Sequence, residues 1–496
     1  MHIFIIVDQG SKMADKNNYD QPRMFEYNDA KSDKFWEIQL DGASHTVRYG
    51  RVGTDGQTKT KEFADADKAV ASYEKLVKAK VGKGYKEISD QSTSRSAAVA
   101  KVKEKNKEHA PFLEAISKAP DNLDNYLVFA DYLEEQGDPR GEFIRTQCAL
   151  EDEATSAAER KKLKALEKKL LKANQAEWLG DLADDLINQK APEEFGRYGD
   201  SKIYNWAFAR GFLDSLTISY LLPKFAKLLK KSSSAKGLRR LVIRDTSNGY
   251  DFEDYEEYQD EEFDEDGSPG FEALLGIKLE NLRYLEISED DQMSCHIRCE
   301  GIERLLKQTP RLEVLGLHCH EIDTTKLFKS KLPELRSLSV KHCHNFDFKA
   351  LAGNKAFAKL ESICFHPHAM EYGEEAYIGN DDFASLCKSK NLTSLKEIDL
   401  TCTSLEDPAI ESLVKSSLLG QLETIKIAHS GLKDESANLL AAADLGNLKT
   451  LDLSYNYMTE EGVETLTAAF PRLVAQQQYA ISSYEEGEHL YQGDYE

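Results

Sequence analysis

Histidine and cysteine are concentrated in three short segments that have the clearest capacity for chemistry. These are His318-Cys319-His320, His342-Cys343-His344 and His366-Pro367-His368, and the pair Cys295-x-x-x-Cys299 precedes them. Imidazole and thiolate groups are ligands that zinc prefers. A zinc site and a structural role in a repeat are therefore the alternatives for these residues.

Catalytic signatures are absent from the sequence. The patterns G-x-S-x-G, G-x-x-x-x-G-K-[ST], H-E-x-x-H and G-x-G-x-x-G do not occur. Gly50, Gly53 and Gly56 lie in a strand–turn context without a following phosphate-binding helix, so they are interpreted as turn glycines. We expect no enzymatic activity, no cofactor and no small-molecule substrate, with an unrecognised enzyme as a distant alternative.

An internal repeat supplies the elements that would position the histidines. The pattern L-x-x-L-x-L, with substitutions by other apolar residues, occurs nine times. Three apolar positions at this spacing predict a short strand whose inward residues stack on the next coil. The frames begin at Leu213, Leu238, Leu282, Leu312, Leu335, Leu360, Leu395, Leu422 and Leu448.

Helices are expected between these strands. Pro408–Leu413 and Glu460–Leu466 have helical patterns, and Asp407 and Thr459 stand at the capping positions before them. One strand and one helix per coil resembles the ribonuclease-inhibitor type of leucine-rich repeat, most clearly in NLKTLDLSYNYMTEEGVETL. The sequence therefore predicts an α/β solenoid of leucine-rich repeats over residues 188–475.

A polar or small residue follows eight of the nine frames at a fixed position, three residues after the last apolar one. Such a site hydrogen-bonds to the turning backbone, and we call it the ladder site. Its residues are Thr246, Asp290, His320, Cys343, His368, Thr403, Ser430 and Asn456. This position gives His320, Cys343 and His368 a structural role. Because Lys341 stands between His318 and His366 at the last strand position, we expect no metal.

The concave side of such a solenoid is the second candidate site. Solenoids present extended faces of this kind to proteins. The face mixes both signs of charge and has little aromatic character, so it predicts a protein partner without identifying one. The residues chosen for it are Arg240, Arg244, Tyr284, Glu286, His318, Lys341, His366, Asp399, Lys426 and Asp452.

Two acidic insertions stretch the repeat. The segment from Tyr250 to Asp266 holds eleven carboxylates in seventeen residues, and a milder insertion lies between the frames that begin at Leu360 and Leu395. A run of like charges repels itself, so we expect the first insertion to be a mobile loop.

A helical module is expected at residues 110–187, after a linker at 91–109. Its string DYLEEQGDPRGEFIR and the later Glu177-Trp178-Leu179-Gly180 closely resemble a module that accompanies repeat arrays in some bacteria. The resemblance covers about 75 residues and implies a bacterial origin, but it implies no chemistry.

Residues 24–90 alternate as strands and end in one amphipathic helix. At RYGRVGTDGQTKTKEF they resemble a WGR domain, as in bacterial molybdate-regulator-like proteins and poly(ADP-ribose) polymerases. The name-giving triplet is present as Tyr49-Gly50-Arg51, with Tyr in place of Trp. In the polymerases this motif stacks on a DNA terminus, which implies a stacking role for Tyr49 and a phosphate or interdomain contact for Arg51.

Charge gives partial support to nucleic-acid contact by this module. Residues 31–110 carry 17 Lys/Arg against 12 Asp/Glu, a net charge of +5 on a chain of −23. Lys59 and Lys61 lie two apart on a strand and so project from one face. Two alternatives stay open: contact with DNA or RNA ends through Tyr49, Arg51, Lys59 and Lys61, or a module whose tyrosine only packs.

Composition completes the expectations. No run approaches the roughly 20 apolar residues of a membrane span, and eight scattered cysteines indicate reduced thiols in the cytoplasm. We expect a disordered segment at 1–23 and an acidic, Tyr-rich tail at 476–496. The predicted function is a non-enzymatic adaptor that binds protein through the concave face, with a nucleic-acid-binding regulator as the alternative.

Overall fold

The computed structural model describes most of the chain and divides it into two compact units. The described residues are 22–29, 32–51, 56–87, 108–189, 203–244, 274–288, 297, 299–319, 322–368 and 378–482. The units are Met1–Lys118 and Ala119–Glu496, and we call the second the α/β region. The acidic insertion at Tyr250–Asp266 and the predicted disordered segment up to residue 21 lie outside the described residues.

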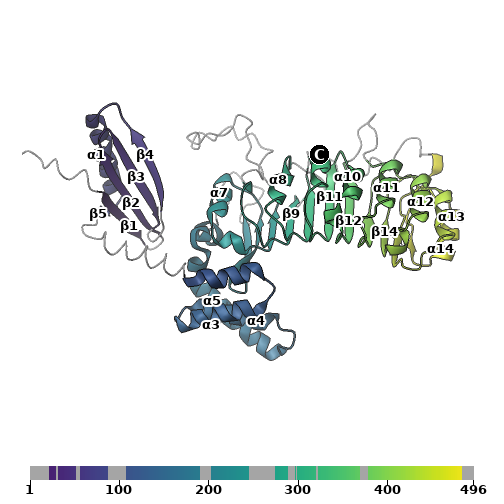
Figure 1. The fold of residues 1–496 in the computed structure, drawn as a ribbon, viewed down its shortest axis with the longest axis horizontal. Coiled ribbons are helices and arrows are strands. Elements are labelled where there is room, and N and C mark those ends of the chain that lie inside the picture. Colours follow the sequence, from purple (N-terminus) through teal and green to yellow (C-terminus); the bar gives the residue numbers. More distant parts are fainter. Residues whose placement is uncertain are drawn as a thin grey trace, which may run out of the picture. The chain divides into compact units, whose positions relative to one another are not determined.

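The first unit contains a five-stranded sheet with the order β4-β3-β2-β1-β5 (Figure 1). All of its pairings are antiparallel. Its elements are β1 (Arg23–Asp29), β2 (Ser32–Asp41), β3 (Ser44–Arg51), β4 (Gln57–Glu62), α1 (Ala66–Gly82) and β5 (Lys86–Glu87).

Helix α1 covers one face of this sheet. It begins at Ala66 because the side chain of Asp65 accepts a hydrogen bond from the backbone N–H of Lys68 at 2.8 Å. Tyr73 of this helix is buried beside Phe25 and Trp36 of the sheet. The ring centroids of Phe25 and Trp36 lie 5.5 Å apart. The alternating strand pattern therefore places the apolar side of the sheet against one helix.

A helical module begins the α/β region. Side chains cap three of its helices, and Pro139 stands at the start of the second. Phe143 stacks on Trp178 at 4.6 Å between centroids, and both belong to one hydrophobic core with the large sheet. The module and the sheet are thus a single compact unit. The helices are α3 (Leu123–Glu135), α4 (Pro139–Glu151), α5 (Ala157–Leu179) and α6 (Ala183–Ile187).

Among the described residues, the large sheet has eleven strands that follow one another in chain order. Strand β6 is antiparallel to β7, and every later neighbour is parallel. The strands are β6 (Tyr204–Ala209), β7 (Phe212–Ile218), β8 (Arg240–Ile243), β9 (Tyr284–Ser288), β10 (Val314–His318), β11 (Ser337–Cys343), β12 (Ser362–Pro367), β13 (Glu397–Asp399), β14 (Thr424–Lys426), β15 (Thr450–Asp452) and β16 (Leu473–Val474).

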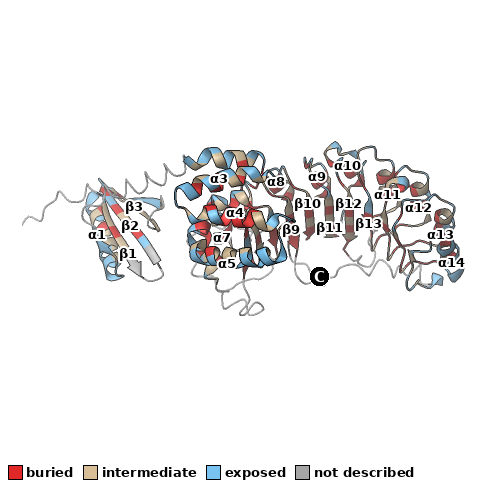
Figure 2. Ribbon diagram, turned by 90° about the horizontal axis from the view of Figure 1, so that it is seen from below, coloured by how far each residue is buried: buried red, intermediate tan, exposed pale blue. Residues whose placement is uncertain are grey.

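Short helices alternate with these strands along the chain and lie along one side of the sheet (Figure 1). Their buried side chains share the core with the strands, as the red segments of Figure 2 indicate. The helices are α7 (Pro223–Lys231), α8 (Ile302–Leu306), α9 (Thr324–Leu327), α10 (Phe348–Gly353), α11 (Asn380–Cys387), α12 (Asp407–Val414), α13 (Asp434–Ala441) and α14 (Glu460–Ala469).

The predicted strand register is confirmed. Leu315 lies opposite Leu285 on one side and Leu338 on the other, and Ile425 lies opposite Leu451. The three apolar positions of all nine frames are buried, with at most 2% of any of these residues exposed. Each frame therefore contributes to a continuous core.

At three of the residues that the structure describes, the ladder side chain bonds to the backbone. Asn456 donates from Nδ2 to the carbonyls of Ile427 and Leu453 at 2.7 and 3.1 Å. Thr403 Oγ1 donates to the carbonyl of Leu400 at 3.2 Å, and Cys343 Sγ to that of Ile322 at 3.7 Å. The predicted structural role of this position is confirmed at these three residues. Thr246, Asp290 and His320 lie outside the described residues.

The residue before the ladder site turns the backbone, which the sequence did not indicate. His342, Cys402, His429 and Tyr455 have φ angles of +59°, +61°, +49° and +57°. Non-glycine residues rarely adopt this left-handed conformation. Its recurrence shows that four strand ends share one strained turn directly before the ladder site.

The chain continues to contact the last coil beyond the predicted boundary at residue 475. The backbone N–H of Tyr479 donates to the carbonyl of Asn456 at 2.6 Å, and its hydroxyl lies 2.8 Å from His429 Nδ1. Residues 476–482 therefore belong to this end of the sheet and not to the predicted tail. Among the described helices, none has the length and apolarity needed to cross a membrane.

Candidate binding face of the large sheet

One side of the parallel sheet carries the polar residues of alternating strand positions. In β11 and β12 the buried core positions alternate with half-buried ones, and β9, β14 and β15 begin with the same alternation. Side chains at alternate positions point to opposite sides of a sheet. We call this side the strand face. It includes Tyr284, Glu286, Ser337, Ser339, Lys341, Ser362, Cys364, His366, Glu397, Asp399, Thr424, Lys426, Thr450 and Asp452.

An ion-pair cluster occupies the strand face near β8 and β9. Arg240 lies over the ring of Tyr284, with its guanidinium carbon 3.6 Å from the centroid. Glu286 accepts hydrogen bonds from Tyr284 and Arg244, and Arg244 also donates to Ser288 at 2.6 Å. Burial disfavours the charged carboxylate, but these donors outweigh it and lower the pKa of Glu286. The predicted residues Arg240, Arg244, Tyr284 and Glu286 are thus neighbours.

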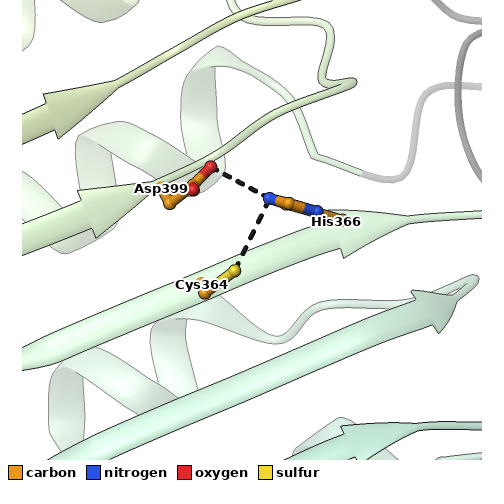
Figure 3. A group of neighbouring side chains, drawn as sticks. All are labelled: Cys364, His366 and Asp399. Carbon is orange, nitrogen blue, oxygen red and sulfur yellow. Dashed lines mark hydrogen bonds and ion pairs between the residues drawn. The ribbon is translucent and has the colours of Figure 1, made fainter. Parts of the chain in front are cut away.

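A second cluster lies where β12 meets β13 (Figure 3). Cys364 is directly opposite Asp399 in the parallel register, and His366 lies two residues farther along β12. His366 Nε2 is 2.9 Å from Asp399 Oδ1 and 3.5 Å from Cys364 Sγ. Thr401 donates to the same Oδ1 at 2.8 Å, and Lys426 Nζ lies 3.6 Å from Oδ2. Three different donor groups therefore converge at one point.

The surroundings favour the charged forms of this cluster. Burial opposes the imidazolium, but the hydrogen bonds to Asp399 and Cys364 raise the pKa of His366 to about 9. Burial also opposes the thiolate, yet the contact with His366 lowers the pKa of Cys364. The carboxyl pKa of Asp399 is lowered too, because His366 and Thr401 donate to it against the effect of burial.

The geometry of the cluster does not match a nucleophilic triad. In a triad the base uses one ring nitrogen toward the nucleophile and the other toward the carboxylate. Here both Cys364 and Asp399 address Nε2 of His366. One nitrogen cannot accept the thiol proton while it donates to the carboxylate, so this arrangement does not support general-base activation of Cys364.

His318 corrects the predicted set. It is buried, with 7% of the residue exposed, and its ring packs edge-on against His342 at 5.7 Å. His342 is itself fully buried and has a positive φ at the strand end. His318 is therefore a packing residue and is not available on the strand face, whereas Lys341, Lys426 and Asp452 remain half-exposed there.

The residues chosen in the first unit share one side of its sheet. Tyr49 and Arg51 are two residues apart on β3 and therefore point to the same side as Val47 and His45. Lys59 and Lys61 lie opposite Val47 and His45 and share that side. His45 Nε2 lies 3.0 Å from Ser72 Oγ of α1, so this is the side that α1 covers.

Tyr49 is a packing residue at the margin of that core. Its ring contacts the hydrophobic cluster, and its hydroxyl donates to Gln57 Oε1 at 3.3 Å. Lys59 and Lys61 are exposed on the edge strand β4, and Lys61 Nζ lies 5.4 Å from the ring centroid of Phe63. The two lysines are accessible, whereas the ring of Tyr49 is partly buried against the core.

The sequence pointed to His366 and Asp399 separately, but not to their association with each other or with Cys364. The expectation of no metal rested on His318, Lys341 and His366, which lie side by side on three neighbouring strands. The residues that come together are Cys364 and His366, which are two residues apart on β12, and Asp399, which lies directly opposite Cys364 on β13. Alignment of the frames beginning at Leu360 and Leu395 contains this signal, because it pairs Cys364 with Asp399.

Comparison with known proteins identifies the first unit. The model of the WGR domain matches residues 21–92, and this part of the chain is a WGR domain. The chain is 45% identical over 65 residues to the protein YfeS of Escherichia coli K12, covering 13% of this chain and 27% of that protein. It is 36% identical over 113 residues to the E. coli protein YehF, covering 21% and 41%. The chain thus spans less than half the length of both relatives.

Two solved structures overlap larger parts of the chain. A Bacteroides fragilis protein covers 92% of this chain and 98% of its own length, at 19% identity and a TM-score of 0.38. An internalin from Listeria monocytogenes covers 51% of this chain and 71% of its own length, at 15% identity and a TM-score of 0.28. Because both TM-scores lie below 0.5, neither similarity defines the fold of this chain.

Proposed function

We propose that this protein is a non-enzymatic adaptor whose α/β region is a leucine-rich-repeat solenoid of the ribonuclease-inhibitor type. The buried frames, the parallel strands in chain order and the helix after nearly every strand support this class. The WGR domain is an accessory module. The described cysteines form no disulfide with one another, which supports a reducing, cytoplasmic setting.

The strand face is the protein-binding surface in this proposal. The observation that carries it is the alternation of buried and half-exposed positions on successive parallel strands, which leaves polar side chains of both charges on one continuous side. An extended face with complementary charge gives specificity for a protein surface. A small ligand would instead need an enclosed pocket.

Site-specific photo-crosslinking in cells tests this proposal. Benzoylphenylalanine is placed at Ser339 and Thr424 on the strand face and, as matched controls, at the exposed Lys388 and Lys415 beside α11 and α12. We expect the same protein to be crosslinked from both face positions and from neither control. Equal crosslinking from the control positions, or none from the face, would contradict the proposal.

Nucleic-acid contact by the WGR domain is the second candidate function. Exposed Lys59 and Lys61 on an edge strand support it, together with Lys80, which lies 5.6 Å from the ring centroid of Trp36 and 4.8 Å from that of Tyr85. Fluorescence anisotropy of the full chain with blunt-ended and single-stranded DNA near roughly 50 mM salt, where electrostatic contacts are strong, tests it. Absence of binding by the folded chain would remove this candidate and leave the adaptor.

A further inference from the structure

Cys364, His366 and Asp399 offer three different donor atoms at one place on the strand face (Figure 3). Their ligand atoms all lie within 4.8 Å of one another. Sulfur, imidazole nitrogen and carboxylate oxygen together suit a borderline ion such as Zn²⁺ or Co²⁺, whereas Mg²⁺ and Ca²⁺ take oxygen ligands. The donor set thus selects a class of metal.

The distances are close to those that such an ion requires. Zinc-type ions bind sulfur at about 2.3 Å and nitrogen or oxygen at about 2.0–2.1 Å. In a tetrahedral site these bond lengths place sulfur ~3.5 Å from nitrogen and nitrogen ~3.3 Å from oxygen. The structure has 3.5 Å from Sγ to Nε2 and 2.9 Å from Nε2 to Oδ1. The distance from Cys364 Sγ to the carboxylate oxygen of Asp399 is at most 4.8 Å, so it must shorten by at most about 1.3 Å to fit the same tetrahedral geometry.

The orientation of His366 carries the same implication. Both partners address Nε2, which excludes a nucleophilic triad in this arrangement but places that nitrogen between the sulfur and the carboxylate, where a metal ion would take the place of its proton. We propose that Cys364, His366 and Asp399 bind a divalent transition metal of the zinc class and leave a fourth position to solvent. The side chains of His366 and Asp399 are 24% and 22% exposed, so an ion has access.

The neighbouring charges define the kind of metal site. Lys426 lies 3.6 Å from the second oxygen of Asp399, and Lys341 is opposite His366 on β11. These cations oppose a bound cation, and only three protein ligands are present. The ion therefore exchanges with solvent and is not a structural metal of the closed, four-ligand type. This site does not depend on protein binding by the strand face.

Cobalt titration of the full chain tests the proposal. Untagged protein, purified with chelator and then desalted, is titrated with Co²⁺ and followed by thiolate-to-cobalt charge-transfer absorption, with Zn²⁺ added afterwards. We expect a one-to-one endpoint, absorption typical of four coordination, and loss of the signal when Zn²⁺ displaces Co²⁺. A folded wild-type chain without this absorption would overturn the proposal.

Variants assign the ligands. Cys364→Ser should abolish the charge-transfer absorption, and His366→Gln and Asp399→Asn should each weaken Co²⁺ binding more than tenfold. Cys402→Ser removes another half-buried thiol and is the matched control that should leave the titration unchanged. Circular dichroism establishes that each variant is folded. A signal retained in folded Cys364→Ser, or abolished in folded Cys402→Ser, would show that the thiolate ligand lies elsewhere.

Discussion

The WGR sheet and the large parallel sheet both alternate apolar and polar residues, but they differ in where the candidate residues lie. In the WGR domain Tyr49 is on the side that α1 covers, and its ring contacts the core. In the α/β region Lys341 and His366 lie on the side opposite the buried frames. The same alternation therefore means packing in one sheet and an accessible surface in the other.

The two ion clusters of the strand face differ in a related way. Glu286 has guanidinium and hydroxyl donors that satisfy its carboxylate. In the other cluster, Cys364 and Asp399 share one nitrogen of His366. The carboxylate of Glu286 is therefore satisfied by its own donors, whereas the sulfur of Cys364 and the carboxylate of Asp399 both face Nε2 of His366.

The largest expected effect is a difference in stability between substitutions on the two sides of β11. Leu338→Ala removes a side chain that is 1% exposed, and we expect a loss of about 2–5 kcal/mol in the free energy of unfolding. Ser339→Ala, one residue along on the strand face, should change it by less than about 0.5 kcal/mol. Urea unfolding of the full chain measures both, and similar losses would contradict the assignment of the two sides.

The ladder site should give the next largest effect. Asn456→Ala leaves the carbonyls of Ile427 and Leu453 without their side-chain donor. We expect a loss of about 1–3 kcal/mol, the cost of unsatisfied buried polar groups. Asn438→Ala on the exposed side of α13 is the matched control and should be nearly neutral. An equal effect at Asn438 would argue against a special role for the ladder.

Tyr49 tests the packing interpretation in the WGR sheet. Tyr49→Ala should destabilise the domain by about 1–2 kcal/mol, because the ring is only partly buried. Tyr49→Phe removes the hydroxyl bond to Gln57 and should cost less. Melting temperature and DNA retention are measured together. Loss of DNA binding with an unchanged melting temperature would instead assign Tyr49 to a stacking role.

The smallest effect concerns the exposed lysines. If the WGR domain binds phosphate, the pair Lys59→Ala and Lys61→Ala should reduce the salt dependence of DNA binding by about one ion for each phosphate that is no longer neutralised. Stability should not change, because both side chains are exposed. The pair Lys75→Ala and Lys78→Ala on α1 has the same charge change and is the control. Equal effects from both pairs would indicate general charge attraction.

The repeat made the large sheet predictable. Each frame constrains three buried positions, and nine frames test one another, so the register followed from the sequence. The turn before the ladder site did not follow, because His342, Cys402, His429 and Tyr455 share a φ angle and not a residue type. Backbone geometry imposed by hydrogen bonds leaves no common side-chain signal.

The candidate site was predictable only in part. Arg240, Arg244, Tyr284 and Glu286 were assigned to one face because the frames align them, and the structure places them in contact there. His318 was expected on the accessible face, but its ring is buried against His342, whose positive φ has no sequence signal. The cluster of Cys364, His366 and Asp399 was missed because it combines spacing along one strand with a partner on the next.

Binding of the crosslinked partner tests the central claim that the strand face binds protein. The purified partner is titrated with the wild-type chain, with the double variant Arg240→Glu and Lys341→Glu, and with the control Lys388→Glu and Lys415→Glu, which has the same net charge. We predict that the face variant weakens binding at least tenfold and that the control binds like the wild type. Equal affinity of the two variants would contradict the account.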